Sequence, residues 1–139
     1  MKSLTFWKLL AIIGWLLAFF LLFMWLWFPD LEAKEITLTA SWYSISSLHK
    51  DGQWSKTKGR CADGSIFKDD NFTCATRLFP LGSVIRITNS LNNKSVTVIV
   101  TDRIGKRFAK TRIDLSKKAF STIANLKQGI ISCKVERIK

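Results

Sequence analysis

Two aspartates occupy positions that suit acid–base chemistry. Asp102 ends the alternating segment Ser95–Asp102 and has the same parity as its three valines. A carboxyl group that is partly buried at a strand end loses solvation of its charged form, which raises its pKa towards the range of a general acid. The alternative is a solvated aspartate in a turn. Asp114 precedes a helical segment, and it is either a second acid or a helix-start residue whose carboxylate accepts from free amides.

The other side chains of interest are aromatic or titratable. Tyr43 and the tryptophan before it end another alternating segment, so one ring of the two faces the core and the other faces outward. We expect Tyr43 to be the outward ring, where it could contact a sugar. The single histidine, His49, has no cluster of potential ligands around it, so we expect a solvated or locally packed side chain, and no metal site is predicted.

The chain has three cysteines, Cys61, Cys74 and Cys133. In an oxidising compartment they permit one internal disulfide and leave one thiol over, and their spacing alone does not select the pair. A disulfide between Cys61 and Cys74 would close the loop around the CADG turn and stabilise the fold by roughly 3 kcal/mol. Buried free thiols are the alternative, because Cys74 and Cys133 both have core-facing parity.

Short strands must position these side chains. Alternation and turn residues predict a last strand opening at Gly129 and four earlier ones at residues 36–43, 72–78, 84–89 and 95–102. The polar residues 44–58 are predicted to form a long loop. The only clear helical spacing covers Lys117–Ala124, with Ser116 as its N-cap. Many short strands with one short helix favour a small β-barrel over alternating βαβ units.

The N-terminal segment is a separate element. Residues 9–28 contain no charged residue, and twenty residues at about 1.5 Å each cross the ~30 Å hydrocarbon core of a bilayer. A transmembrane anchor is predicted over a cleaved signal peptide, whose apolar stretch is shorter. Lys2 and Lys8 place the N-terminus in the cytoplasm. The predicted organisation is therefore a cytoplasmic segment at 1–8, an anchor at 9–28, a linker at 29–35 and a domain outside the membrane at 36–139.

Basic residues outnumber acidic ones, with 22 Lys and Arg against 10 Asp and Glu. Without Lys2 and Lys8, 20 basic residues face the 10 acids, which gives about +10 for the rest of the chain. An anionic partner is expected, and a merely basic, soluble surface is the alternative. A domain outside the membrane meets cell-wall polymers and lipid headgroups, and no nucleic-acid motif is present, so nucleic acid is not the predicted partner.

Six segments occur in the order and spacing of a known family: ASWY at 40–43, ADG at 62–64, TCATRLFPLG at 73–82, IRITN at 85–89, VIVTDR at 98–103 and RIDLSKKAF at 112–120. Over about residues 38–138 the chain resembles the rare lipoprotein A family of double-psi β-barrels, which is related to the catalytic half of expansins. The resemblance implies a mainly β fold, a six-stranded double-psi barrel with one short helix.

The resemblance also implies a lytic transglycosylase that cleaves peptidoglycan glycan strands. An acid protonates the glycosidic oxygen, and the 6-hydroxyl of the sugar then closes an anhydro ring in place of water, so one carboxyl group serves as acid and then as base. No metal or cofactor is required. Asp102 matches the family's aspartate in a DRG-type turn, and Asp114 matches the acid of the IDLS motif.

Some positions depart from the pattern of active family members. Thr76 and Ser65 stand where the family usually has a histidine and an acid, and Ile-Gly follows Arg103 where the family tends to have Gly-Pro. The resemblance implies substrate contacts for Ser65, Thr76 and Arg103, in addition to the contact expected of the Tyr43 ring. Because the usual titratable pair is replaced, the alternatives are a non-catalytic, expansin-like module that binds or loosens the wall, and an interaction-only module.

Overall fold

The computed structural model of the protein describes residues 5–27 and 35–139. The chain divides into two compact units, Met1–Glu32 and Ala33–Lys139. Lys2 of the predicted cytoplasmic segment and residues 29–34 of the predicted linker lie outside the described residues.

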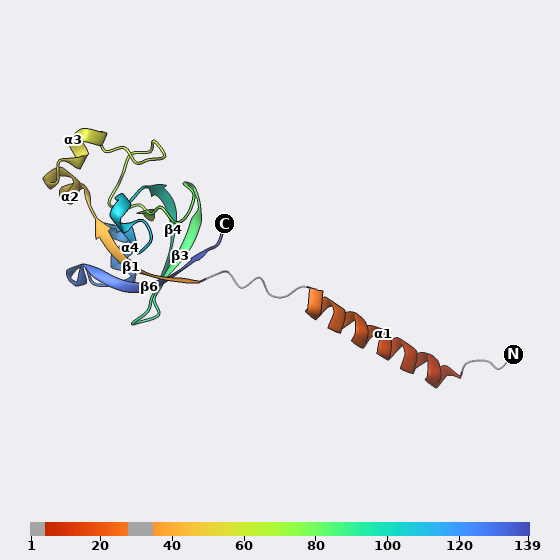
Figure 1. Cartoon of the computed structure of the whole chain (residues 1–139). Helices are drawn as coiled ribbons and strands as arrows, with labels where there is room; N and C mark the ends of the chain where they lie inside the picture. Colours follow the sequence, from red (N-terminus) through yellow and green to blue (C-terminus); the bar gives the residue numbers. More distant parts are fainter. Residues whose placement is uncertain (1–4, 28–34) are drawn as a thin grey trace. The chain divides into compact units, whose positions relative to one another are not determined.

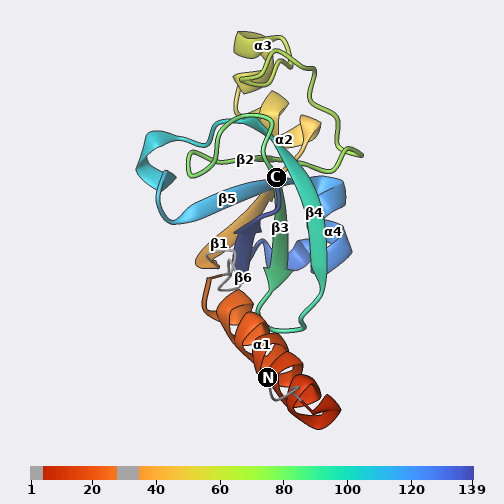
Figure 2. The same ribbon diagram turned by 90° about the vertical axis from the view of Figure 1, so that its right-hand side faces the viewer.

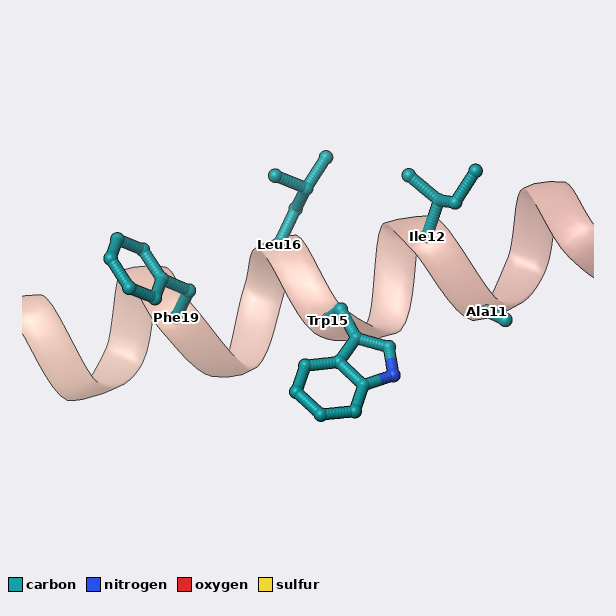
Figure 3. A pocket seen from close by; sticks show the side chains of 5 residues that line it. All are labelled: Ala11, Ile12, Trp15, Leu16 and Phe19. Atoms are coloured by element: carbon teal, nitrogen blue, oxygen red, sulfur yellow. The ribbon is translucent and has the colours of Figure 1, made fainter.

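Helix α1 (Phe6–Trp27) belongs to the first unit and is 22 residues long. Large apolar side chains are exposed along it, and Trp15 is 80% exposed. Figure 3 shows five apolar side chains of α1 around a pocket on the helix surface: Ala11, Ile12, Trp15, Leu16 and Phe19. Within the described ranges, no helix combines the length and apolar character that crossing a membrane requires. The anchor at residues 9–28 stays a prediction.

The second unit contains a closed six-stranded β-barrel, which confirms the predicted barrel (Figure 1). Its strands in chain order are β1 (Ile36–Tyr43), β2 (Thr73–Ala75), β3 (Val84–Asn89), β4 (Ser95–Asp102), β5 (Arg112–Ser116) and β6 (Ile130–Arg137). Around the barrel the order is β1-β5-β2-β4-β3-β6. The pairs β1–β5 and β2–β4 are parallel, and the other four are antiparallel.

Alternation along the strands builds the core. Ile85 and Ile87 of β3 are buried, and so are the three valines of β4, whereas Ile99 is exposed on the opposite side from the valines. Both strands have the predicted bounds. Helix α4 (Lys117–Ile123) packs onto the barrel through Phe120, which is fully buried. Ser116 is its N-cap, as predicted, and the Ser116 hydroxyl accepts from the backbone N–H of Ala119.

The predicted loop over residues 44–58 is wrong in part, because it contains two short helices, α2 (Ile45–Lys50) and α3 (Gln53–Thr57) (Figure 2). Ser44 and Ser47 form a capping box at the start of α2. Neither helix has a buried residue, so the sequence carries no apolar periodicity there. The expectation of one short helix is therefore corrected, and two 3₁₀ helices also occur, η1 (Lys106–Phe108) and η2 (Leu126–Gln128).

Candidate functional site

The strand order of the barrel places the two aspartates on either side of the short strand β2 (Figure 2). Asp102 ends β4, and Asp114 is the middle residue of β5. Ala75 of β2 is in register with both of them. Neighbouring strands lie about 4.8 Å apart, so the two aspartate Cα atoms are roughly 10 Å apart. Strand pairing thus brings together two acids that are twelve positions apart in the sequence.

A β-bulge sets the direction of the Asp102 side chain. In the β2–β4 pair, Cys74 is in register with Val100 but Ala75 with Asp102, so Thr101 is the extra residue. With regular alternation the Asp102 side chain would point into the core, as the Val100 side chain does, and this is what its parity predicts. The bulge instead puts Asp102 on the side of Ala75, which is also the side of Asp114. Both carboxyl groups therefore belong to the outer face of the barrel wall.

Asp102 is half-buried and fixed through one of its two carboxyl oxygens. Its Oδ1 accepts from the backbone N–H of Ala62 at 3.0 Å and from that of Arg103 at 2.8 Å. Burial raises the pKa of the Asp102 carboxyl, while these two hydrogen bonds and the Arg103 charge oppose the rise. Because both bonds use Oδ1, Oδ2 is the oxygen that can carry and transfer a proton.

Asp114 is held from the neighbouring strand β1. The hydroxyl of Ser41 donates to Asp114 Oδ1, and the two residues are in register across the β1–β5 pair. Burial raises the pKa of Asp114, and the Ser41 hydrogen bond and the charge of Arg112 oppose the rise. The alternative role as a helix-start residue is not what the structure contains, since Ser116 caps α4. Asp114 is a second half-buried acid in the same face.

Tyr43 lies on the same face of β1 as Ser41, two residues further along. Its ring stacks on Phe67 with 4.4 Å between the ring centroids. Its hydroxyl is buried and has no hydrogen-bond partner among the described residues. Burial raises the pKa of the phenol, and the nearby charges of Asp102 and Asp114 raise it further. Because Phe67 covers one face of the ring and the hydroxyl is buried, Tyr43 packs beside the acids and presents no exposed polar group to a ligand.

The three further residues predicted to contact substrate are engaged within the protein. The Ser65 hydroxyl donates to Asp63 Oδ1 at 2.6 Å, and Ser65 itself is exposed. Thr76 is fully buried, and its hydroxyl accepts from Leu78 N. Arg103 donates through Nη1 to the carbonyl oxygens of Thr76 and Phe79, each at 2.7 Å. Arg103 therefore fixes the turn after β2, and Thr76 contributes to its interior.

A cavity of about 270 Å³ lies on the β4 side of the site. Its lining comes from the segment before β2, from the first residue of β2 and from β4, and it consists of Cys61, Asp63, Ser65, Ile66, Phe67, Lys68, Asn71, Thr73, Ile99 and Thr101. By contrast, the pocket on α1 has only apolar lining and offers no group for acid–base chemistry (Figure 3). His49 stacks on Trp54 with 4.9 Å between the ring centroids, so it is locally packed, as expected.

All three cysteines are free and buried, so the disulfide between Cys61 and Cys74 is not formed. Burial raises the pKa of each thiol, that of Cys133 to about 12. A thiol with a raised pKa holds little nucleophilic thiolate at neutral pH. The structure therefore contains the buried thiols that were the alternative, and they are not candidates for covalent catalysis.

Sequence reasoning missed three contributors to the site: Ser41, Phe67 and the backbone N–H of Ala62. Ser41 shares the parity of Tyr43, so the sequence could have predicted the direction of the Ser41 side chain. It could not have predicted that Asp114 is its hydrogen-bond partner. Ala62 belongs to the CADG turn, where Asp63 N donates to the Thr101 carbonyl at 3.0 Å and holds the turn against β4. No local pattern predicts such a long-range contact.

The fold and site define a class of protein: a closed six-stranded barrel that presents two half-buried carboxyl groups on one face of its wall, beside a buried tyrosine. The chain belongs to the lytic transglycolase family, whose model matches residues 35–135. The resemblance to rare lipoprotein A that the sequence motifs indicate is thereby confirmed.

Curated relatives and solved structures agree with this assignment. The endolytic peptidoglycan transglycosylase RlpA of Rickettsia felis is 40% identical over 76% of this chain, and that of Neisseria meningitidis is 35% identical over 79%. The chain spans 44% and 43% of the length of these two proteins. An expansin of Clavibacter michiganensis, solved with cellohexaose, has a TM-score of 0.56 at 16% identity, covering 76% of this chain and 51% of the expansin. The expansin likeness shows a shared fold.

Proposed function

We propose that this chain cleaves the glycan strand of peptidoglycan as a lytic transglycosylase, with Asp102 as its acid and base. The observation that carries the proposal is the environment of Asp102: its carboxyl group is half-buried, two N–H groups donate to Oδ1, and neither of these bonds uses Oδ2. Family membership and the names of the curated relatives support it.

The chemistry follows from the raised pKa of Asp102. Its protonated carboxyl group donates the Oδ2 proton to the glycosidic oxygen, and the bond from this oxygen to the anomeric carbon breaks. The resulting carboxylate then takes the proton of the sugar's 6-hydroxyl as that oxygen attacks the anomeric carbon, which restores the acid. Asp114, as a carboxylate, supplies negative charge for the cationic sugar in the transition state.

Mass analysis of reaction products tests the proposal. Purified peptidoglycan glycan strands incubated with the full chain should yield products with anhydro ends, each lighter by one water than a hydrolysed product. Hydrolysed reducing ends would contradict the transglycosylase mechanism, because they require water as the nucleophile.

A second candidate, a binding module without cleavage, is favoured by one observation. The positions where the family usually has a histidine and an acid hold the buried Thr76 and the exposed Ser65, and neither side chain titrates. This candidate replaces the first if the full chain binds glycan strands and forms no anhydro ends, and if binding weakens in Asp102→Asn.

The proposed location is the outer side of the cytoplasmic membrane, with residues 9–28 as a membrane anchor. The uncharged, apolar run of residues 9–28 in the sequence supports this. Full-length protein should sediment with membranes and resist carbonate extraction, whereas a chain that begins at Glu35 should be in the supernatant. Recovery of native protein as a soluble form that starts near Lys34 would contradict the anchor.

A further inference from the structure

An unusual group of cations lies between the two strands that carry the acids. After Asp102 the chain passes through η1 and returns as β5 towards Asp114. In this connection the guanidinium carbons of Arg107 and Arg112 lie 4.5 Å and 4.3 Å from the ring centroid of Phe108. Two guanidinium groups thus contact one aromatic ring, and we call these three residues the arginine cluster.

The arginine cluster is fixed on the same face as the acids. Arg112 lies two residues before Asp114 in β5, so the two side chains leave the strand on the same side. The backbone holds the turn in place, since Phe108 accepts from Thr111 N at 3.2 Å and Thr111 accepts from Thr39 N at 3.0 Å. The cluster is therefore a built feature of the wall next to Asp114, at a fixed position along β5.

The two guanidinium groups lack an ion-pair partner within the described residues. The ion pairs found there join Arg86 to Glu136 and Lys134 to Glu35. The Nε atom of Arg112 is buried and makes no hydrogen bond among the described residues. Asp114 is the nearby acid, and its Oδ1 already accepts from Ser41. Arg107 is exposed and Arg112 is half-buried, so the cluster keeps positive charge and N–H donors other than the buried Nε for a ligand.

We propose that the arginine cluster binds carboxylate groups of the glycan strand that Asp102 acts upon, and this inference rests on the proposed function. The planar fork of a guanidinium group fits a carboxylate through two parallel hydrogen bonds, and its weak hydration reduces the cost of the contact. A strand that extends from Asp102 past Asp114 would meet the cluster next. The cluster would then fix the register of the strand and so select the bond that is cleaved.

Binding of defined, peptide-free glycan strands to the full chain in detergent tests the proposal. All measurements use an Asp102→Asn background, so that no strand is cleaved. Arg107→Gln with Arg112→Gln should weaken binding about tenfold or more. The matched control, Lys94→Gln with Lys127→Gln, removes the same charge from exposed positions of the β3–β4 turn and η2, and it should change binding by less than about threefold. Strands whose carboxylates are methyl-esterified should bind weakly to the chain that keeps both arginines. Their affinity should equal that of unesterified strands for the Arg107→Gln, Arg112→Gln variant.

The outcomes separate this inference from the proposed function. If no strand binds to any variant, the proposed function falls and the inference falls with it. Binding that is equal in the arginine and lysine variants, or equal for free and esterified strands, overturns only the inference. A variant with both arginines replaced by lysine is the folding control, because it keeps both positive charges. Its thermal melt, compared with that of the glutamine variant, shows whether weaker binding reflects a folding defect. If poly(glycerol phosphate) depends on the arginines and the glycan does not, the cluster binds a phosphate polymer and the inference is wrong.

Discussion

Asp102→Asn should reduce the formation of anhydro ends by at least about 10²-fold, because a single general acid contributes on the order of 10²–10⁴-fold to such a reaction. Asparagine keeps an Oδ1 that can accept from Ala62 N and Arg103 N, so the side chain should stay in place. What it loses is the transferable proton at Oδ2. Product formation measured by mass analysis at saturating glycan checks the result.

Thermal melts over a range of pH supply the control for this variant. The pKa of Asp102 in the fold is raised above its ordinary value of 3.8, so the stability from its protonated form is present below pH 3.8 and is lost as pH rises through the raised pKa. Asparagine does not ionise, so Asp102→Asn does not lose this stability as pH rises. We therefore expect the variant to melt at or above the wild-type temperature at neutral pH, with the difference vanishing in acid.

An inactive variant that also melts well below the wild type at neutral pH would contradict this assignment, because Asp102 would then be structural. Asp70→Asn is a matched control, since Asp70 is an exposed carboxyl group in a turn before β2. It should leave both product formation and the melting temperature unchanged. Activity that falls equally in both variants would point to general charge effects in place of acid catalysis.

Local patterns predicted the parts of the fold that local physics determines. Strands β3 and β4 alternate apolar and polar residues because one face is core, and their bounds follow from that alternation. Helix α4 and its cap at Ser116 follow from helical spacing and a single local hydrogen bond. Asp102 was proposed as an acid because it ends such a strand. It is partly buried as expected, but on the outer face of the barrel and not on the core side that its parity predicts.

Features that depend on distant partners were not predicted. The bulge at Thr101 decides the direction of Asp102, and it exists only because β2 pairs with β4 in a shifted register. The hydrogen bond from Ser41 to Asp114 joins residues 73 positions apart. Strand β5 has only five residues, and its Leu115 has helical spacing with the buried residues of α4. The sequence pattern therefore indicated only the helix, and the strand was not predicted. The site is arranged by pairing between distant strands, and such pairing produces no pattern within any one segment of the sequence.

Phe120→Ala should be the most destabilising single change in the barrel unit, at about 3–5 kcal/mol for a fully buried phenylalanine. Phe120 is a large, fully buried side chain that packs α4 against the core. Both ends of α4 are fixed to other elements: Ser116 ends β5 at its start, and Asn89 Nδ2 donates to the Ile123 carbonyl at 2.9 Å at its end. The helix therefore has little freedom to move and fill the cavity that alanine leaves.

A loss of this size removes much of the 5–15 kcal/mol that ordinarily stabilises a domain. Denaturant unfolding followed by circular dichroism measures it, with the exposed Lys117→Ala in the same helix as a control that should change stability by less than about 0.5 kcal/mol. A cost below about 1.5 kcal/mol would show that α4 does not anchor the core. Product formation by Phe120→Ala should fall only as the folded fraction falls with temperature, whereas Asp102→Asn should be inactive while folded.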